Sequence, residues 1–188
     1  MKAGQTNIIG VLMTVAIAII VTAITIAWAI PLIENTKDFA ELKNLENKFI
    51  ELNEAIKYAA AYQTSVSVPI ELNKGYITLK DNRTILYSGQ LALKTPVPQK
   101  ALIGDLNNLN KIGILGKDDF AILIEQGSLE IYLTYIPLKD STNKTHQIFL
   151  SPGAMPGAGK GRHVLIVSFK ESKSGLNSTN TTIIFDVK

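Results

Sequence analysis

The chain begins with a long run of apolar residues. From Ala3 to Ile33 no side chain is charged, and the stretch Ile8–Ile33 (IIGVLMTVAIAIIVTAITIAWAIPLI) consists almost wholly of aliphatic and small residues. A helix of that length reaches about 39 Å at about 1.5 Å per residue, more than the roughly 30 Å of a bilayer's hydrocarbon core. The pattern predicts a helix over residues 5–33 that is able to cross a membrane.

The pattern becomes amphipathic beyond this run, and residues 34–62 are predicted to continue the helix. Within Lys37–Tyr62 the apolar positions alternate at spacings of three and four, which is the a and d pattern of a heptad. These seam residues are Leu42, Leu45, Phe49, Leu52, Ile56 and Ala59. Two interpretations stay open. The seam belongs to a stalk helix that packs on the β domain or on neighbouring subunits, or to an ordinary amphipathic helix that covers its own domain.

After Tyr62 the hydrophobic period shortens to two, which predicts strands. The predicted strands are Ser65–Leu72, Tyr76–Lys80, Thr84–Ser88, Gln90–Lys94, Phe120–Glu125, Leu129–Ile136, Gln147–Leu150, His163–Lys170 and Thr182–Val187. Turn residues at Asn73–Gly75, Asp81–Arg83 and Gln126–Gly127 connect some of them. Val97–Lys117 fits a loop or a short helix, and Ser172–Thr182 a loop. We therefore predict an α+β fold, with an antiparallel β-sandwich-like domain over residues 63–188.

Small residues form a ridge along the apolar helix. Gly10, Thr14, Ala18 and Thr22 recur every four residues, and the ridge continues through Thr25 and Ala29. Small side chains at this spacing let helix backbones approach closely, and threonine hydroxyls bond within or between helices. The ridge predicts packing among copies of the same helix. The other interpretation is a single anchor that is rich in alanine and threonine.

The flanks of the apolar run predict its orientation in a membrane. Lys2 and the amino terminus precede it, whereas Glu34, Lys37 and Asp38 follow it. Because positive flanks stay in the cytoplasm, the β domain is expected outside the cell. Four N-x-[ST] triplets are typical of a glycosylated surface protein, and their acceptors are Asn82, Asn143, Asn177 and Asn180.

The residues before the apolar run predict a short leader peptide. An ordinary secretory signal has an apolar stretch of about 7–15 residues followed by a small-residue cleavage site, and this stretch is longer. The small-residue junction here lies before the run, at Lys2-Ala3-Gly4, followed by Gln5. Cleavage between Gly4 and Gln5 would remove residues 1–4 and leave the apolar helix at the new amino terminus.

This arrangement resembles the type IV pilin superfamily, in particular the archaeal pilins and archaellins. The resemblance covers the leader, the apolar helix and its polar continuation, roughly residues 1–62. It implies cleavage by a prepilin peptidase on the cytoplasmic side and assembly of the helix into a filament core. Two positions depart from the pattern: Ile9 stands where many pilins have glutamate, and Asn7 where many archaellins have glycine.

Composition and charge argue against other functions. The chain has no cysteine, two histidines and a net charge of +3 in scattered lysines, so thiol chemistry, a multi-histidine metal site and a nucleic-acid interface are not expected. Gly153–Gly161 lacks the helix that a phosphate loop needs and predicts a flexible surface loop. His146, His163 and the aspartates Asp105, Asp118 and Asp119 show no catalytic or metal-ligand spacing. We expect no enzymatic activity, cofactor or metal.

The sequence therefore predicts a structural subunit of an extracellular type IV pilus-like filament that serves adhesion. A membrane-held precursor would lose its leader and then assemble with copies of itself through the apolar helix. The alternative is a membrane-anchored surface or accessory protein, such as a minor pilin or a component of an archaellum or secretion system, that binds a protein partner through its β domain.

Overall fold

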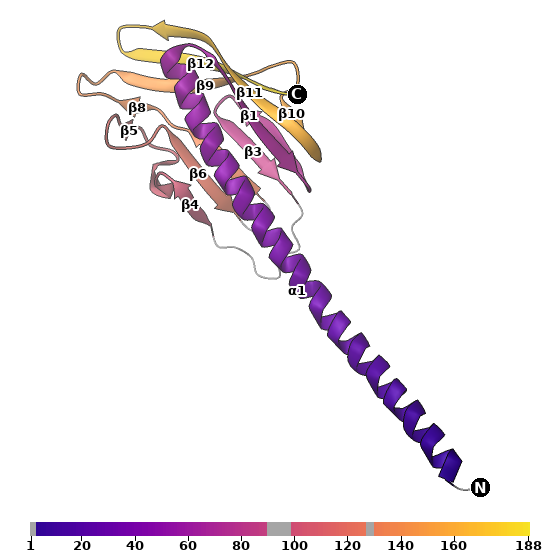
Figure 1. Ribbon diagram of the computed structural model, residues 1–188. Coiled ribbons are helices and arrows are strands. Elements are labelled where there is room, and N and C mark those ends of the chain that lie inside the picture. Colours follow the sequence, from indigo (N-terminus) through magenta and orange to yellow (C-terminus); the bar gives the residue numbers. More distant parts are fainter. Residues whose placement is uncertain (1–2, 90–98, 127–129) are drawn as a thin grey trace. The chain divides into compact units, whose positions relative to one another are not determined.

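A computed structural model describes residues 3–89, 99–126 and 130–188 (Figure 1). One long helix, α1 (Ala3–Tyr62), precedes two sheets of six strands each, so the fold is α+β. The chain divides into two compact units, of which the first ends at Ala40 and the second begins at Glu41. The first unit is helical. The second contains the last part of α1 and both sheets.

The strands form two mainly antiparallel sheets. Sheet A has the order β1 (Ser65–Leu72), β11 (Gly161–Ser174), β12 (Ser178–Val187), β9 (Thr145–Pro152), β8 (Leu138–Lys139) and β5 (Gly113–Ile114). Sheet B has the order β10 (Gly157–Ala158), β2 (Tyr76–Asp81), β3 (Thr84–Ser88), β7 (Glu130–Tyr135), β6 (Ala121–Gln126) and β4 (Lys100–Ile103). The pairs β9–β12 and β5–β8 are parallel. A short 3₁₀ helix, η1 (Leu106–Asn108), lies between β4 and β5.

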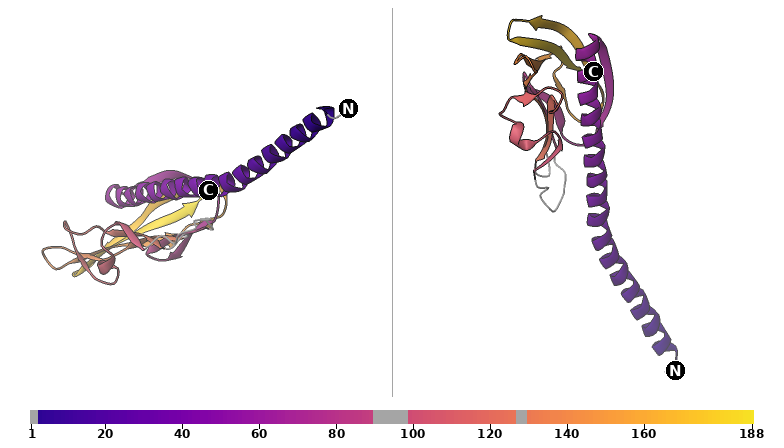
Figure 2. Two further views of the ribbon diagram at one scale, coloured as in Figure 1. Left: turned by 90° about the horizontal axis from the view of Figure 1, so that it is seen from below. Right: turned by 90° about the vertical axis from the view of Figure 1, so that its left-hand side faces the viewer.

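The heptad seam of α1 packs into the core of its own domain. All six seam residues from Leu42 to Ala59 are at most 6% exposed, and they join one hydrophobic cluster with residues of both sheets, such as Phe185 of β12 and Leu133 of β7. Figure 2 shows this part of α1 lying along the strands. The structure thus supports the interpretation in which the helix covers its own β domain.

Strand β6 is buried on both faces. Ala121 and Leu123 face the main core, whereas Ile122 and Ile124 belong to a second cluster with residues such as Leu138. Because both faces are covered, the strand is a continuous apolar run rather than an alternating one. Residues around η1, which include Leu106 and Leu109, cover the outer side of the second cluster.

Most predicted strands are confirmed, and two, β1 and β3, have the predicted bounds. The predicted turn at Asn73–Gly75 is also confirmed. Gly75 has φ +72°, and a Cβ there would lie 2.3 Å from the backbone oxygen of Ser88, so only glycine fits. The predicted strand Gln90–Lys94 and residue Gly127 of another predicted turn lie outside the described residues.

The predicted loop over Ser172–Thr182 is wrong, because β11 and β12 pair through most of it. Their register continues to Ser174 opposite Thr179, and only Gly175, Leu176 and Asn177 form the turn. The hydroxyl groups of Ser172 and Thr181 lie 3.3 Å apart across this pair. Polar β-branched residues and cross-strand hydroxyl pairs favour a strand here although the segment has no apolar face.

Replacing Phe49 tests whether the seam of α1 supports the β domain. Phe49 is 0% exposed, so Phe49→Ala removes a ring from the main core and is expected to cost about 3–5 kcal/mol of unfolding free energy. The neighbouring Ile50 is 37% exposed, and Ile50→Ala is expected to cost less than about 1 kcal/mol. Urea unfolding of the full chain in detergent measures both; equal losses would contradict the assigned helix face.

Candidate functional site

The apolar part of α1 is exposed throughout its described length. Its large side chains are about half to two-thirds exposed, and Trp28 is 73% exposed. The most apolar window of 18 residues has none of its residues buried, and the helix is long and apolar enough to cross a membrane. Since exposing apolar surface to water costs about 25 cal/mol per Å², this helix suits lipid or a protein partner rather than water.

The predicted small-residue ridge lies on one side of this helix. At about 100° per residue, the six positions from Gly10 to Ala29 fall within about 120° of the helix circumference. A Cβ added at Gly10 would meet nothing within 4 Å, so the chain's own fold does not require glycine there. The space beside Gly10 is therefore open to contact with another molecule.

The threonine hydroxyls of the ridge are bonded within the helix. Thr14 Oγ1 donates to the carbonyl oxygen of Gly10 at 2.9 Å, and Thr22 Oγ1 donates to that of Ala18 at 2.8 Å. Thr25 bonds in the same way to Val21. A second helix that approaches the ridge therefore meets small side chains whose hydroxyl donors already bond within α1. Close packing rather than new hydrogen bonds would govern this contact.

The predicted cleavage junction lies at the beginning of α1. Because α1 begins at Ala3, the backbone of Gly4 and Gln5 is in its first turn. Cleavage between these residues stays a prediction.

The predicted glycan acceptors lie on turns and on one strand. Asn82, Asn143 and Asn177 are exposed in turns, whereas Asn180 is half-buried within β12. The amide of Thr145 donates to the carbonyl oxygen of Asn177 at 3.0 Å, which places the turns that carry Asn143 and Asn177 at the same end of sheet A. Asn143, Asn177 and Asn180, three of the four predicted acceptors, therefore lie at one end of sheet A.

Asp140 organises the turn that precedes β9. One oxygen, Oδ1, accepts hydrogen bonds from the amides of Thr142 and Lys144 and from the Thr142 hydroxyl, and Oδ2 lies 2.9 Å from Nε2 of His146. The bonds from Thr142, followed by the one from His146, hold the pKa of Asp140 well below its usual range. Spacing along the chain shows no sign of this partner for His146, because the conformation of the turn brings the two side chains together.

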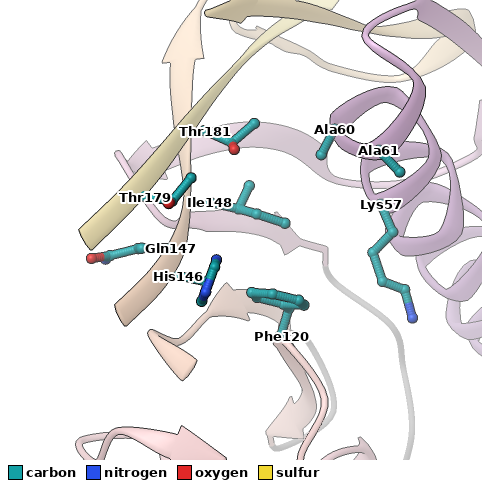
Figure 3. Close-up of a pocket in the computed structure, with 9 residues that line it drawn as sticks. All are labelled: Lys57, Ala60, Ala61, Phe120, His146, Gln147, Ile148, Thr179 and Thr181. Carbon is teal, nitrogen blue, oxygen red and sulfur yellow. The ribbon is translucent and has the colours of Figure 1, made fainter. Parts of the chain in front are cut away.

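His146 also lines a cavity of about 330 Å³ at one end of the β domain (Figure 3). Figure 3 shows its ring beside that of Phe120, and the end of α1 that carries Ala60 and Ala61 across from the strands. Thr179 and Thr181 of β12 stand opposite His146 and Ile148 of β9 in register. These positions continue the core-facing rows of both strands, where buried apolar residues give way to polar ones. Lys57 at the rim is paired with Glu54 and Asp119.

The other candidate residues have structural partners. His163 Nε2 lies 2.9 Å from the carbonyl oxygen of Gly159, and Asp105 Oδ1 accepts from the amide of Asn107 at the beginning of η1. Asp118 Oδ2 accepts from the amide of Ile114, and Asp119 pairs with Lys57. Among the described residues, no group of three or more histidine, aspartate or glutamate side chains could hold a metal ion.

The segment Gly153–Gly161, which we predicted as a flexible surface loop, is held to the sheets by hydrogen bonds and a short strand. It contains strand β10, which pairs with β2, and the amide of Leu79 donates to the carbonyl oxygen of Pro156 at 2.9 Å. The amide of Met155 donates to Asp186 Oδ1 at 2.6 Å. The glycines here allow close approach to β2, since a Cβ on Gly157 would lie 2.7 Å from the backbone oxygen of Ile77.

No family model, curated protein or solved structure matches the chain. The architecture itself, a long N-terminal apolar helix followed by a β-rich domain, is compatible with that of a pilin.

The network around Asp140 predicts a loss of stability in acid. Because its pKa is lower in the folded chain, Asp140 stabilises the fold above the unfolded pKa of about 4, and this contribution disappears as the pH falls through the folded value. Asp140→Asn is expected to lower the urea midpoint at pH 7 and to reduce the difference between pH 7 and pH 3. The exposed carboxylate of Glu71 provides the control Glu71→Gln, which should change neither; equal effects of the two variants would contradict this role.

Proposed function

We propose that the chain is a structural subunit of an extracellular filament built on the type IV pilin plan. The observation that carries the proposal is the apolar part of α1, whose large side chains are exposed although one face of the same helix, from Leu42 to Ala59, is buried in the β domain. In the precursor this part would lie in the membrane. In the filament it would pack against the same part of neighbouring subunits.

The transfer from lipid to a helix bundle is physically reasonable. Both environments are apolar, so exclusion of water provides little driving force and the fit between helices decides assembly. The small-residue ridge allows backbones to approach, and its threonine donors are already satisfied by Gly10, Ala18 and Val21. The helices therefore need no polar partner in the filament core.

The β domain would form the outer surface of the filament and serve adhesion. The flanking charges favour its location outside the cell. Three of the predicted glycan acceptors, Asn82, Asn143 and Asn177, are exposed on turns, where a transferase has access to the asparagine. Glycans at these positions would point away from the core without disturbing a strand.

A second candidate is a membrane-anchored accessory protein that binds a protein partner. Three aliphatic side chains favour it, because Ile112, Ile114 and Leu115 are 51%, 55% and 39% exposed beside one another in the β domain. The backbone there is fixed by hydrogen bonds, such as that from the Leu115 amide to the carbonyl oxygen of Lys139 at 2.8 Å. Exposed aliphatic side chains on a backbone held in this way would suit contact with a partner.

Enlarging the ridge tests the filament. Gly10→Leu and Ala18→Leu are expected to abolish filaments on the cell surface, since a large side chain separates the helix backbones, while the chain still inserts into the membrane. Ile20→Leu, which keeps its volume and lies away from the ridge, is the matched control. Electron microscopy of sheared filaments and blots of membrane fractions measure the two outcomes. Normal filaments from both ridge variants would refute packing through this ridge.

The amino terminus of the surface-exposed protein tests processing. A subunit that a prepilin peptidase has processed begins at Gln5, so intact mass and N-terminal sequencing of protein from the cell surface should show the loss of residues 1–4. Protein recovered from the membrane of cells without the peptidase is the control and should keep them. A surface-exposed chain that retains Met1 or Lys2 would exclude processing and favour the anchored accessory protein.

A further inference from the structure

Two carboxyl groups are buried between α1 and sheet B. Glu46 on α1 is 4% exposed, and Glu125 on β6 is 3% exposed. An ionised carboxylate in such a place is costly unless other groups compensate for the lost water. Neither residue has a part in the filament proposed above, so the pair needs an explanation of its own.

Within the described part of the chain, Glu46 forms a salt bridge with a lysine of its own helix. Lys43 Nζ lies 2.5 Å from Glu46 Oε2 in an i, i+3 pair, and the Lys43 side chain is 59% exposed, so its ammonium group remains in contact with water. Glu125 stands opposite Lys100 of β4 in the antiparallel register. Within the described part of the chain, no donor bonds to Oε1 of Glu125, and this oxygen is buried.

A proton on one of the two carboxyl groups would provide a donor inside this buried pair. The carboxyl groups of Glu46 and Glu125 interact with each other, and two ionised carboxylates offer each other only acceptors. With one proton between them, the protonated group donates to the ionised one, and Lys43 compensates the single remaining charge. We propose that Glu46 and Glu125 share one proton and form a pH-dependent latch between α1 and β6.

The electrostatic surroundings agree with the latch. Burial raises the pKa of Glu125 first, and the hydrogen bond with Glu46 and the negative charge of Glu46 raise it further, to about 7. Lys100 from β4 and Lys43 from α1 act in the opposite direction. Because the two carboxyl groups interact strongly, the value belongs to the pair rather than to Glu125 alone.

The sign of the pH effect follows from the raised pKa. Below about pH 4.5 the folded and the unfolded chain are both protonated at this site, so the latch contributes fully. Between about 4.5 and 7 the folded chain holds a proton that the unfolded chain has lost, and stability falls as the pH rises. Above about 7 the pair has lost its proton, and the hydrogen bond that depends on that proton is lost with it.

Replacing Glu125 by its uncharged isostere tests the latch in the full chain in detergent. Glu125→Gln keeps a donor toward Glu46 at every pH, so its melting temperature should match the wild type at pH 5, exceed it at pH 8 and lose the dependence between them. Near-ultraviolet circular dichroism of the buried tyrosines follows the melting. Glu51→Gln, at an exposed carboxyl of the same helix, is the control and should melt like the wild type at both values. If the melting temperatures of the wild type and Glu125→Gln fell in parallel between pH 5 and pH 8, the proposed latch would be overturned.

A titration separates the latch from a merely structural role of Glu125. Carboxyl ¹³C resonances should show one of the two groups titrating near pH 7 in the wild type and neither in Glu125→Gln. Lys43→Met keeps the aliphatic stem but removes the charge that lowers the pKa of Glu125, so the same transition should move to higher pH. Titration of both wild-type groups near 4.5, or no movement in Lys43→Met, would contradict a shared proton.

Discussion

A single helix in two different environments is the constraint on which the structure depends. From Leu42 to Ala59 the heptad seam of α1 is buried and completes the core that both sheets share. From Gly10 to Ile33 the same helix keeps its apolar side chains exposed. The β domain therefore cannot form its core without the helix. The exposed apolar part of the helix is unfavourable in water. The lipid or protein that surrounds the apolar segment is therefore connected to the core of the domain through the continuous backbone of α1.

The sequence predicts those elements whose pattern is local. The end of α1 at Tyr62 and the bounds of β1 and β3 follow from a change of period and from turn residues such as Gly75. The two-residue strands β5, β8 and β10 are too short to show a pattern of their own, because only their pairing with other strands defines them. The outer part of the β11–β12 hairpin, which was predicted as a loop, was missed for a different reason: both strands continue past the core, where no apolar face marks them.

The candidate sites divide in the same way. The ridge from Gly10 to Ala29 follows from helical spacing, and the structure adds that its threonines bond to their own helix. The pairs Asp140–His146 and Glu46–Glu125 depend on a turn conformation and on the register of a helix against a strand, neither of which spacing reveals. Glu46 lies outside the heptad seam that the sequence predicts. In the structure it is buried beside the seam.

The buried polar groups of α1 also fix the position of the helix on the sheets. Asn53 is 0% exposed and accepts a hydrogen bond from the Tyr135 hydroxyl of β7 at 3.0 Å, and it stands seven residues after Glu46, which meets β6. A seam of leucines and isoleucines alone would pack almost equally well after a shift of one turn. Such a shift would leave Asn53, Tyr135 and both carboxyl groups buried without partners, at about 1–3 kcal/mol for each unpaired group. Two polar contacts one heptad apart thus select one register, as a buried asparagine does in coiled coils.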